Sequence, residues 1–566
     1  MKKLPIGLCD FEELISENYY FVDKTLLIKD ILDGGAKAIL IPRPRRFGKT
    51  LNMTMLKCFF EKPVLSSVEG TSKSKRNLFN NLKISEHDDI MAHQGQYPVI
   101  FMTFKEAKQG DWDICFKQIK EILGSEFSRH GYLLESNILS DVQKGNYKAV
   151  IDGNADYVLY QNALKDLSAF LTRYHNKKPI ILIDEYDAPI QAGFINHYYK
   201  EVINFMRGTL CGGLKDNLYL SFAVMTGVLR VAKESIFSGL NNLKVCSLIN
   251  NTYADKFGLL EDEVQELMDH CNFSGKLNDI KAWYNGYASG DDHTVYNPWS
   301  IINFVDNKGK FQPYWLNTSD NAIIKELIEN GTVDFKLDIE QLIAGNNIEK
   351  YVNENIVFDS VFSQSDVVWS FLLFSGYLSF DKIYLKEELL YGSLRLPNLE
   401  VKSFYKVVIF EWLKNHISMN NYSVMLNSLV SGDIQEFKNI FYDFVLKSFS
   451  AFDTSGKEPE KFYHAFVLGM LVSLSENYEV KSNKESGYGR YDVMIIPKDP
   501  RLRGIIIEFK KIGAAKTDSL EKSVEVALNQ IEEKKYATEL RARGIKDIVR
   551  LGIAFDGKKV LVKEKI

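Results

Sequence analysis

AILIPRPRRFGKT, residues 38 to 50, is the stretch of sequence that decides the fold of the first part of the chain. Its first four residues, Ala38–Ile41, form an apolar run typical of a buried strand, and a helix-like stretch starts at Leu51. Strand, basic loop, Gly-Lys-Thr and helix is the order of a phosphate-binding loop, in which backbone N–H groups at a helix N-terminus face a phosphate. We therefore expect ATP to bind here, with Lys49 on the β- and γ-phosphates and Thr50 on Mg²⁺.

The loop departs from the usual pattern, GxxxxGK[ST], at its first position. Arg43 stands where that pattern has a glycine, and an arginine lacks the freedom of glycine to adopt positive φ. The alternative interpretation is a chance Gly-Lys-Thr in a basic loop. On the first interpretation Arg43, together with its basic neighbours, adds positive charge around the phosphates. The residues expected to line the nucleotide are Arg45, Arg46, Phe47 and Gly48.

A second motif favours ATP binding over a chance match. Residues 178–185, KPIILIDE, form an apolar run that ends in two acidic residues, which is the Walker B arrangement. In that arrangement Asp184 holds Mg²⁺ through water and Glu185 orients the attacking water. A buried strand followed by an acidic turn is the alternative, but the two motifs occur here in the right order along the chain.

Two further candidate residues follow the next apolar run. Residues 221–225 lead into Thr226 and Gly227, and Arg230 comes shortly after. A polar residue at the end of a neighbouring strand can sense the γ-phosphate, and an arginine just beyond can act as a finger for a neighbouring subunit. Thr226 and Arg230 are candidates for these roles in a homo-oligomer. A capped turn and a surface arginine are the alternative.

Short apolar runs alternate with helical stretches through the first half of the chain, which predicts an α/β fold with a parallel, helix-covered sheet. The expected strands are Ala38–Ile41, Val99–Met102, Ile180–Ile183, Leu220–Met225 and Val245–Leu248. From about residue 255 to 400 the pattern becomes largely helical and aromatic, and from 401 it stays helical until Tyr478. We predict three domains, at residues 1–254, 255–400 and 401–566.

A second set of candidate residues lies near the C-terminus, where a hairpin is expected around residues 491–497 and 504–510. With the two-residue period of a strand, Glu508 and Lys510 project to one face of the second strand. Asp492 lies at the start of the first strand. Two carboxylates beside an ammonium group can bind Mg²⁺ and act on a scissile phosphate. The alternative is a solvated hairpin face that carries a Glu and a Lys.

Several motifs together resemble those of the bacterial AAA-ATPase-like family. They are Phe21–Thr25, Arg43–Thr50, Leu182–Asp187, Thr226–Arg230, Tyr284–Tyr287 and Tyr296–Ser300. The resemblance implies a P-loop AAA-type ATPase core followed by a helical lid or winged-helix-like region at residues 255–400. It also implies that an arginine at position 43 is normal for this group. Asp23 and Lys24 either contact nucleotide or form a salt-bridged turn.

The order of residues near the C-terminus resembles the PD-(D/E)XK nuclease superfamily over about residues 459–562. The resemblance implies a restriction-endonuclease-like α/β domain that uses Mg²⁺. Its motif maps onto Asp492, Glu508 and Lys510. The less regular first acidic position of the family maps onto Glu460, with His464 as a competitor. A supporting motif, which orients the lysine and the substrate, maps onto Gln530 and Tyr536.

The composition of the 566 residues, 45% hydrophobic and 25% charged, is that of an ordinary globular protein, and no apolar run is long enough for a membrane helix. The N-terminus has no secretory signal, so we expect a cytoplasmic protein. The six cysteines are scattered singly, which suits reduced packing residues. Because the net charge is −4, any DNA contact needs a local basic patch. The candidates are Arg490, Lys498, Arg501, Arg503, Lys510, Lys511, Arg541, Arg543, Lys546 and Arg550.

The leading hypothesis is an ATP-controlled, Mg²⁺-dependent endo- or exonuclease that acts on DNA rather than RNA, in defence or DNA repair. A second hypothesis is a nucleotide-switched binding protein whose C-terminal fold only grips DNA or a protein. It predicts that Asp492 and Glu508 are dispensable. A third is a remodelling ATPase that works as a ring. It needs Arg230 to act across subunits and predicts nucleotide-dependent oligomers.

Overall fold

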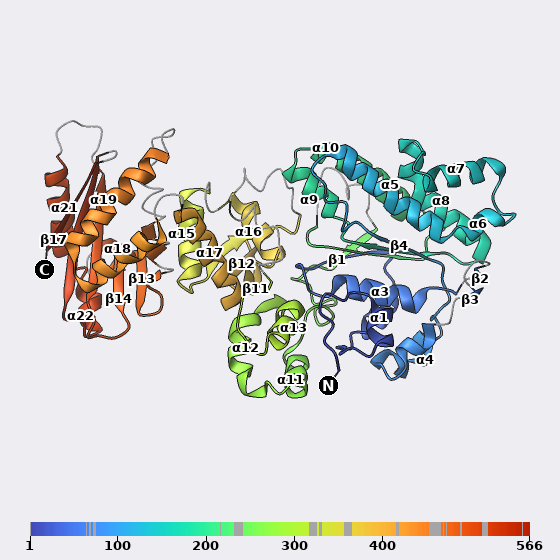
Figure 1. Cartoon of the computed structure of the whole chain (residues 1–566), viewed down its shortest axis with the longest axis horizontal. Helices are drawn as coiled ribbons and strands as arrows, with labels where there is room; N and C mark the ends of the chain where they lie inside the picture. The colour runs from blue at the N-terminus through green and yellow to red at the C-terminus, as the bar shows by residue number, and fades with distance from the viewer. Residues whose placement is uncertain are drawn as a thin grey trace. The chain divides into compact units, whose positions relative to one another are not determined.

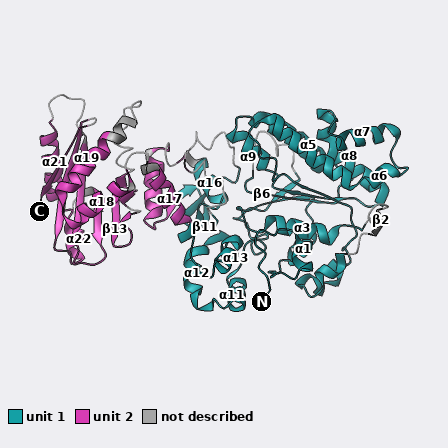
Figure 2. Ribbon diagram, in the orientation of Figure 1, with its two compact units in different colours: residues 1–319, 349–400 teal, residues 320–348, 401–566 magenta. Residues whose placement is uncertain are grey.

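The computed structural model divides the chain into two compact units. Unit 1 comprises residues 1–319 and 349–400, and unit 2 comprises residues 320–348 and 401–566 (Figure 2). The residues that the structure describes are 2–63, 65–66, 70–71, 75–215, 217–230, 242–315, 325, 327, 331–355, 365–414, 418–451, 466–467, 469–470, 473–486, 489–511, 519–556 and 559–565. Each unit is built around its own five-stranded sheet.

A parallel sheet forms the centre of unit 1 and confirms the predicted α/β fold (Figure 1). Its strand order is β4-β5-β6-β1-β7, and every pairing is parallel. The strands are β1 (Ala38–Pro42), β4 (Val99–Thr103), β5 (Ile180–Asp184), β6 (Ala223–Gly227) and β7 (Leu243–Val245). All residues of β1, β5 and β6 are buried, because helices cover both faces of a sheet of this kind.

Two of the predicted strands are shifted along the chain. The strand expected at residues 220–225 begins at Ala223 and continues to Gly227, and the strand expected at residues 245–248 already ends at Val245. Ser247 explains the second shift, because its backbone N–H donates to the Asn250 side chain at 2.7 Å and the chain turns there. Short polar side chains that bond nearby backbone groups favour turns over strands.

Helices pack on both faces of the parallel sheet (Figure 1). One face carries α1 (Phe11–Ser16) and α3 (Lys49–Phe60), and the other carries α5 (Trp112–Arg129), α8 (Tyr157–His175) and α10 (Tyr199–Leu214). The shorter elements of this part are α2 (Leu26–Gly34), β2 (Leu65–Ser66), β3 (Gly70–Thr71), α4 (Asp88–Met91), α6 (Tyr132–Glu135), α7 (Asp141–Ile151) and α9 (Ala188–Ile195). Because α3 directly follows β1, the loop between them lies at the carboxyl ends of the strands, where such sheets bind ligands.

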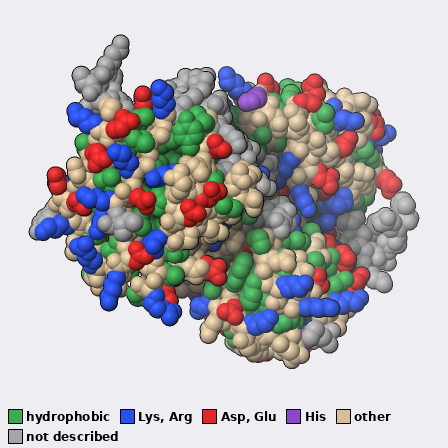
Figure 3. Space-filling view, turned by 60° about the vertical axis from the view of Figure 1, so that its left-hand side comes forward, with side chains coloured by type: hydrophobic (Ala, Val, Ile, Leu, Met, Phe, Trp, Pro, Cys, Tyr) green, Lys and Arg blue, Asp and Glu red, His purple; other side chains and the backbone are tan. Residues whose placement is uncertain are grey.

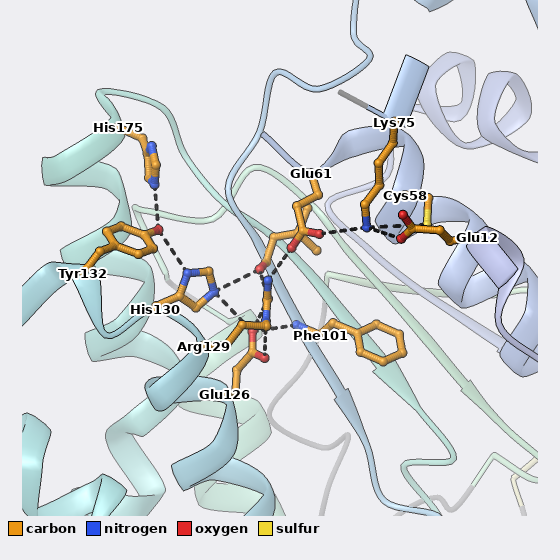
Figure 4. Close-up of polar contacts among 11 residues, drawn as sticks. Glu12, Cys58, Glu61, Lys75, Phe101, Glu126, Arg129, His130, Tyr132 and His175 are labelled. Carbon is orange, nitrogen blue, oxygen red and sulfur yellow. Dashed lines mark hydrogen bonds and ion pairs between the residues drawn. The ribbon is translucent and has the colours of Figure 1, made fainter. Parts of the chain in front are cut away.

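Side chains at the end of α5 close the free edge of β4 (Figure 4). Glu126 accepts a hydrogen bond from the Phe101 N–H at 2.9 Å, and both Arg129 and His130 donate to the Val99 carbonyl. An open strand edge can pair with another chain. These bonds occupy the Phe101 N–H and the Val99 carbonyl, two backbone groups that a further strand would need for pairing with β4.

The remainder of unit 1 is mixed, whereas the sequence predicted a largely helical region. Its helices and strands are α11 (Glu261–His270), α12 (Leu277–Tyr284), β8 (Tyr287–Ser289), β9 (His293–Val295), α13 (Pro298–Asp306), β10 (Ile348–Tyr351), α16 (Ser365–Phe374), β11 (Ser379–Lys386) and β12 (Leu389–Arg395). The turn between β11 and β12 explains why this hairpin was missed. It consists of Glu387 and Glu388 at φ of 50° and 65°, where tight hairpins usually carry Asn-Gly.

A mixed sheet of order β13-β14-β15-β16-β17 forms the centre of unit 2. Only the β15–β16 pairing is parallel, and the predicted hairpin is confirmed as the antiparallel pair β14–β15. The strands are β13 (Tyr478–Ser486), β14 (Gly489–Pro497), β15 (Gly504–Lys511), β16 (Ile548–Asp556) and β17 (Lys559–Lys565). The principal helices are α15 (Val333–Ile343), α17 (Leu399–Lys414), α18 (Met419–Ser431), α19 (Ile434–Ala451), α21 (Leu520–Glu533) and α22 (Thr538–Ala542). Helix α21 packs against β15 and β16.

Two expectations drawn from composition can be compared with the structure. Within the described residues, no helix combines the length and apolar character that a membrane span requires. All six cysteines are free thiols, and Cys58, Cys115, Cys246 and Cys271 are buried. Cys9 is exposed, so it is not the packing residue that the sequence predicted.

Candidate nucleotide and nuclease sites

Asp184 is the centre of a hydrogen-bonded cluster at the carboxyl ends of the parallel strands. Its side chain is fully buried at the end of β5. One carboxylate oxygen accepts from the Thr50 hydroxyl at 2.8 Å and the other from the Thr226 hydroxyl at 2.6 Å. Burial raises the pKa of Asp184, and the two hydroxyl bonds oppose that rise only in part. The fold therefore brings together three residues that the sequence assigned to the nucleotide site.

The loop before α3 is wrapped around the ammonium group of Lys49. This buried Nζ donates to the carbonyl oxygens of Arg43 and Pro44, both at 2.9 Å, and burial lowers the pKa of the amine. Arg46 and Gly48 have φ of 69° and 81°. These two left-handed residues turn the chain into the N-terminus of α3, whose free N–H groups suit an anion.

The Arg43 side chain makes contacts that differ from those predicted for it. Its buried guanidinium donates to three backbone carbonyl oxygens, those of Pro42, Cys246 and Tyr253. Burial lowers its pKa to about 10. The prediction that Arg43 adds charge around a phosphate was therefore wrong, since its donors hold the end of β1 to the segment after β7. Its φ is not positive, so the loop needs no glycine at this position.

The other loop residues predicted to line the nucleotide make contacts outside the loop. Arg45 donates to the Gln191 side chain at 3.1 Å. The Arg46 guanidinium lies 3.9 Å from the centre of the Trp299 ring, and burial lowers the pKa of this arginine. Phe47 is buried, and its ring makes a T-shaped contact with that of Tyr287.

Two acidic residues directly after β5 have different partners. Glu185 has φ of 50°, and its carboxylate lies 3.8 Å from the Lys108 ammonium group. Asp187 is buried and accepts from the backbone N–H groups of Val228 and Leu229, both at 3.0 Å. The sequence analysis gave Asp187 no role. The position of Asp187, three residues after Asp184, gives no sign in the sequence that this side chain holds the segment after β6.

An apolar pocket lies beside the start of α3. It is lined from the N-terminal segment, α3, α11 and α13, by residues that include Leu4, Tyr20, Phe21, Val22, Gly48, Leu51, Leu259, Leu267, Pro298 and Ile302. Lys24 also lines it, but the ammonium group donates to both oxygens of Glu263 and to the Asp255 carbonyl. Asp23 accepts from Thr25. Of the two alternatives for Asp23 and Lys24, the structure contains the salt-bridged turn.

The C-terminal candidate residues meet on the face of the mixed sheet that α21 covers. Glu508 on β15 is buried, and its Oε1 accepts from Lys510 Nζ at 2.8 Å and from Gln530 on α21. Gln530 also donates to the Tyr536 hydroxyl at 3.1 Å. Asp492 on β14 accepts from the Phe509 N–H at 2.7 Å. Five residues from two strands and the α21 segment thus form one cluster.

The electrostatics of this cluster suit a divalent cation. Burial raises the pKa of Asp492, and burial together with the Asp492 carboxylate raises that of Glu508, although Lys510 opposes this. The second carboxylate oxygen of Glu508 is buried without a hydrogen-bond partner among the described residues. Coordination to a hard cation would give this oxygen a partner and would relieve the repulsion between the two carboxylates.

Comparison with known proteins finds two families, each matching a different part of the chain. A family model described as Predicted AAA-ATPase matches residues 5–237, and a model of the PD-(D/E)XK nuclease superfamily matches residues 458–565. The chain carries an AAA-ATPase-like region and a PD-(D/E)XK nuclease superfamily domain. A protein of Azotobacter chroococcum mcd 1, named "Uncharacterized protein in vnfD 5'region", is 25% identical over 561 residues, which are 98% of this chain and 96% of the relative.

The two family matches enclose most of the candidate residues. The AAA-ATPase-like match contains the loop before α3, Asp184, Thr226 and Arg230, and it ends before the motifs at residues 284–287 and 296–300. Proteins of the two families typically use ATP and a divalent metal. A nuclease-superfamily domain is typical of proteins that act on nucleic acid.

Some predicted site residues are not brought together by the described structure. Arg230 lies beyond β6, and within the described residues its buried Nε has no hydrogen-bond partner. Glu460 and its competitor His464 lie outside the described residues. In the described ranges no three His, Cys, Asp or Glu residues form a metal-binding group.

Of the ten basic residues predicted to contact DNA, four pair with acidic ones in the part of the chain that the structure describes, and one of these is Lys510, which pairs with Glu508. Arg501 pairs with Asp499, Arg503 with Asp547, and Arg543 with Glu479 and Glu539. Lys498 donates to two backbone carbonyls. Figure 3 shows Lys and Arg side chains interspersed with Asp and Glu over the visible face. The side chains of Arg490 and Lys511 lie outside the described ones.

Proposed function

We propose that this protein binds and hydrolyses ATP and that its nucleotide state controls a Mg²⁺-dependent DNA nuclease. The observation that carries this proposal is the pair of buried acidic clusters, one at the AAA-ATPase-like loop and one in the nuclease-superfamily domain. In each, a carboxylate whose pKa is raised by burial accepts hydrogen bonds from neutral donors. Lys510 donates to Glu508, and Lys49 directly precedes Thr50, whose hydroxyl donates to Asp184. Sites with perturbed carboxylates next to a lysine are typical of phosphoryl and phosphodiester chemistry.

In the AAA-ATPase-like region, Lys49 is assigned to the nucleotide phosphates, and Thr50 and Asp184 to Mg²⁺. Glu185 orients the attacking water, and Thr226 senses the γ-phosphate through Asp184. Arg45, Arg46, Phe47 and Gly48 enclose the nucleotide, and Arg230 acts on the nucleotide of a neighbouring copy in a homo-oligomer. The apolar pocket beside Gly48 suits the flat apolar faces of an adenine base.

In the nuclease-superfamily domain, Asp492 and Glu508 are assigned to Mg²⁺, with Glu460 as a further acidic residue. Lys510 stabilises negative charge at the scissile phosphate, and Gln530 orients Glu508 and Lys510. We retain the division into domains at residues 1–254, 255–400 and 401–566 as part of this proposal, with the middle part as a lid. Defence against foreign DNA and DNA repair are both compatible with such an enzyme.

A second function is a nucleotide-switched binding protein whose nuclease-like domain is inactive. The observation in its favour is the pairing of Arg501, Arg503 and Arg543 with acidic side chains, which leaves less free positive charge for a DNA backbone. On this proposal the nuclease-like domain grips DNA or a protein, and replacing Asp492 or Glu508 leaves function intact.

The test is cleavage of linear, circular and single-stranded DNA, with RNA as a comparison, by the purified full chain in Mg²⁺. Lys510→Ala is the critical variant. Lys563→Ala is its control, because Lys563 lies on the same sheet but is exposed and pairs with Glu525. We expect cleavage by the wild type and the control, and a loss of about 100-fold in Lys510→Ala. Equal cleavage by all three proteins would contradict the proposal, and no cleavage by any would favour the binding function.

A further inference from the structure

The carbonyl oxygen of Arg45 in the AAA-ATPase-like loop is held from outside the loop. Trp315 donates to it through the indole Nε1 at 3.2 Å, and Asn297 through its amide at 3.5 Å. In a trans peptide the C=O and the next N–H point in opposite directions. The Arg46 N–H therefore faces away from Trp315 because the Arg45 carbonyl is fixed.

The next residue is held by the same neighbouring segment. Arg46 adopts φ of 69°, which is uncommon for an arginine, and its guanidinium stacks on Trp299 at 3.9 Å. Trp299 is itself fixed, because its indole donates to the Tyr314 carbonyl at 3.2 Å. Two consecutive residues of the loop are thus positioned by the segment that contains α13, whose Asn-Pro-Trp-Ser motif has no role in the proposed chemistry.

Glu400 ties this segment together from within the core. Its fully buried carboxylate accepts from the Ser300 hydroxyl at 2.8 and 3.0 Å and from the Trp315 backbone N–H at 2.8 Å. Burial raises the pKa of Glu400 to about 7. Buried carboxylates are costly unless their hydrogen bonds are made, so this residue holds Ser300 and Trp315 in one arrangement.

Glu400 also lies at the point where the chain leaves unit 1. It belongs to the first turn of α17, and unit 2 begins at the next residue, Val401. A continuous set of hydrogen bonds therefore runs from the Arg45 carbonyl through Trp315 to the helix that leads into the nuclease-containing unit. The buried side chains of Trp315 and Glu400 hold the two ends of this set of hydrogen bonds.

We propose that Trp315 and Glu400 are positioning residues that transmit the nucleotide state of the loop to α17. This inference rests on the proposed function, because it requires that the loop binds ATP. When ATP occupies the loop, the orientation of the Arg45–Arg46 peptide changes. The Trp315 indole transfers that change to Glu400 and the start of α17, so unit 2 responds to nucleotide.

The test is hydrogen–deuterium exchange of peptides covering residues 401–411, with and without Mg²⁺ and a non-hydrolysable ATP analogue, in the full chain. Trp315→Phe removes the indole donor and keeps a ring, and Glu400→Ala removes the carboxylate. Glu400→Gln is the conservative variant, because its amide can still donate to Ser300 and accept from Trp315. Trp283→Phe is the control, since Trp283 stacks on Phe311, at 5.7 Å between ring centres. Calorimetry measures analogue binding by each protein.

We expect the analogue to slow exchange in residues 401–411 by about 5-fold or more in the wild type, Trp283→Phe and Glu400→Gln. In Trp315→Phe and Glu400→Ala the effect disappears while the analogue still binds. If the wild type binds the analogue and exchange is unchanged, or if the effect persists in Trp315→Phe, the inference is overturned and the proposed function stands. If the wild type does not bind the analogue, both are overturned.

Discussion

Two buried carboxylates of unit 1, Asp184 and Glu126, have opposite electrostatic environments. Burial would raise the pKa of Glu126, but the Arg129 guanidinium and His130 lower it to about 2 (Figure 4). Asp184 receives hydroxyl bonds from Thr50 and Thr226, and its pKa stays raised. Glu126 has its countercharge within hydrogen-bond distance, whereas Asp184 has no ion-pair partner in the part of the chain that the structure describes and is suited to an added cation.

The position of each carboxylate in the sheet matches this difference. Glu126 closes the edge of β4, where a permanent charge partner stabilises the fold. Its partner Arg129 also pairs with Glu61 at the end of α3. Asp184 lies at the carboxyl ends of the strands, where a ligand can enter. We therefore expect Glu126, which has a complete set of partners at the sheet edge, to be structural, and Asp184, at the carboxyl ends of the strands, to bind a ligand.

The largest effect is expected at Glu126. Glu126→Gln keeps the size of the side chain and removes its charge, which leaves Arg129 without one of its two carboxylate partners in the fold. We expect the free energy of unfolding to fall by about 3 kcal/mol, because breaking a buried ion pair from one side is costly. Chemical denaturation of the two proteins measures this. A loss below about 1 kcal/mol would mean that the network in Figure 4 is not structural.

The low pKa of Glu126 predicts how its contribution to the stability of the fold depends on pH. The folded pKa of Glu126, about 2, lies below its ordinary value of 4.5, so its stabilising effect is complete above pH 4.5 and is lost as the pH falls toward 2. The difference in stability between wild type and Glu126→Gln should therefore shrink between pH 5 and pH 3. Denaturation midpoints of both proteins across that range measure it, and a constant difference would contradict the assignment.

In unit 2, Glu508 is a third buried carboxylate, and we expect it to bind Mg²⁺. Mg²⁺ should raise the melting temperature of the wild type, and at 100 times the dissociation constant the stabilisation is about 3 kcal/mol. Glu508→Gln should lose this response. Glu532→Gln should keep it, because Glu532 is an exposed residue of the same helix as Gln530 and pairs with Lys565. An unchanged Mg²⁺ response in Glu508→Gln would show that this carboxylate binds no cation.

Asp184→Asn should change stability much less than Glu126→Gln does. Because the folded pKa of Asp184 is raised, its charge costs stability at neutral pH, and the amide removes that cost. We expect a change within about 1 kcal/mol, together with loss of Mg²⁺-dependent ATP hydrolysis. A large loss of stability would place Asp184 in the structural class with Glu126.

The smallest effect is expected at the ion pair between the exposed Lys108 and the half-buried Glu185. At 3.8 Å, with the Lys108 side chain 40% exposed, Lys108→Ala should cost less than about 0.5 kcal/mol of stability. Denaturation of the variant beside the wild type measures this. A larger loss would mean that Lys108 also supports the fold around Glu185.

The sequence predicted those features that depend on local patterns. The strand, loop and helix around Lys49 and the apolar run before Asp184 are contiguous, so residue type and spacing suffice. The β14–β15 hairpin and the shared face of Glu508 and Lys510 follow from the two-residue period of strands. Each of these predictions needs only a few neighbouring residues.

Features that depend on distant parts of the chain could not be predicted in this way. The guanidinium of Arg43 bonds the carbonyl of Cys246, and nothing near Arg43 in the sequence indicates that partner. Trp315 likewise donates to the Arg45 carbonyl, far from it in sequence, and its backbone N–H donates to the Glu400 carboxylate. The β11–β12 hairpin was missed because its turn lacks the residues that tight turns usually require.

The most direct test of the account is the rate of Mg²⁺-dependent DNA cleavage with and without ATP, compared between the wild type and Lys49→Ala. Among the described residues the Lys49 ammonium group donates hydrogen bonds within its own loop, to the Arg43 and Pro44 carbonyls. Lys49 lies in unit 1, so the variant leaves the cluster around Glu508 intact. The account predicts that ATP changes the rate of the wild type and has no effect on Lys49→Ala. Equal rates with and without ATP in the wild type, or an ATP effect that survives in Lys49→Ala, would contradict it.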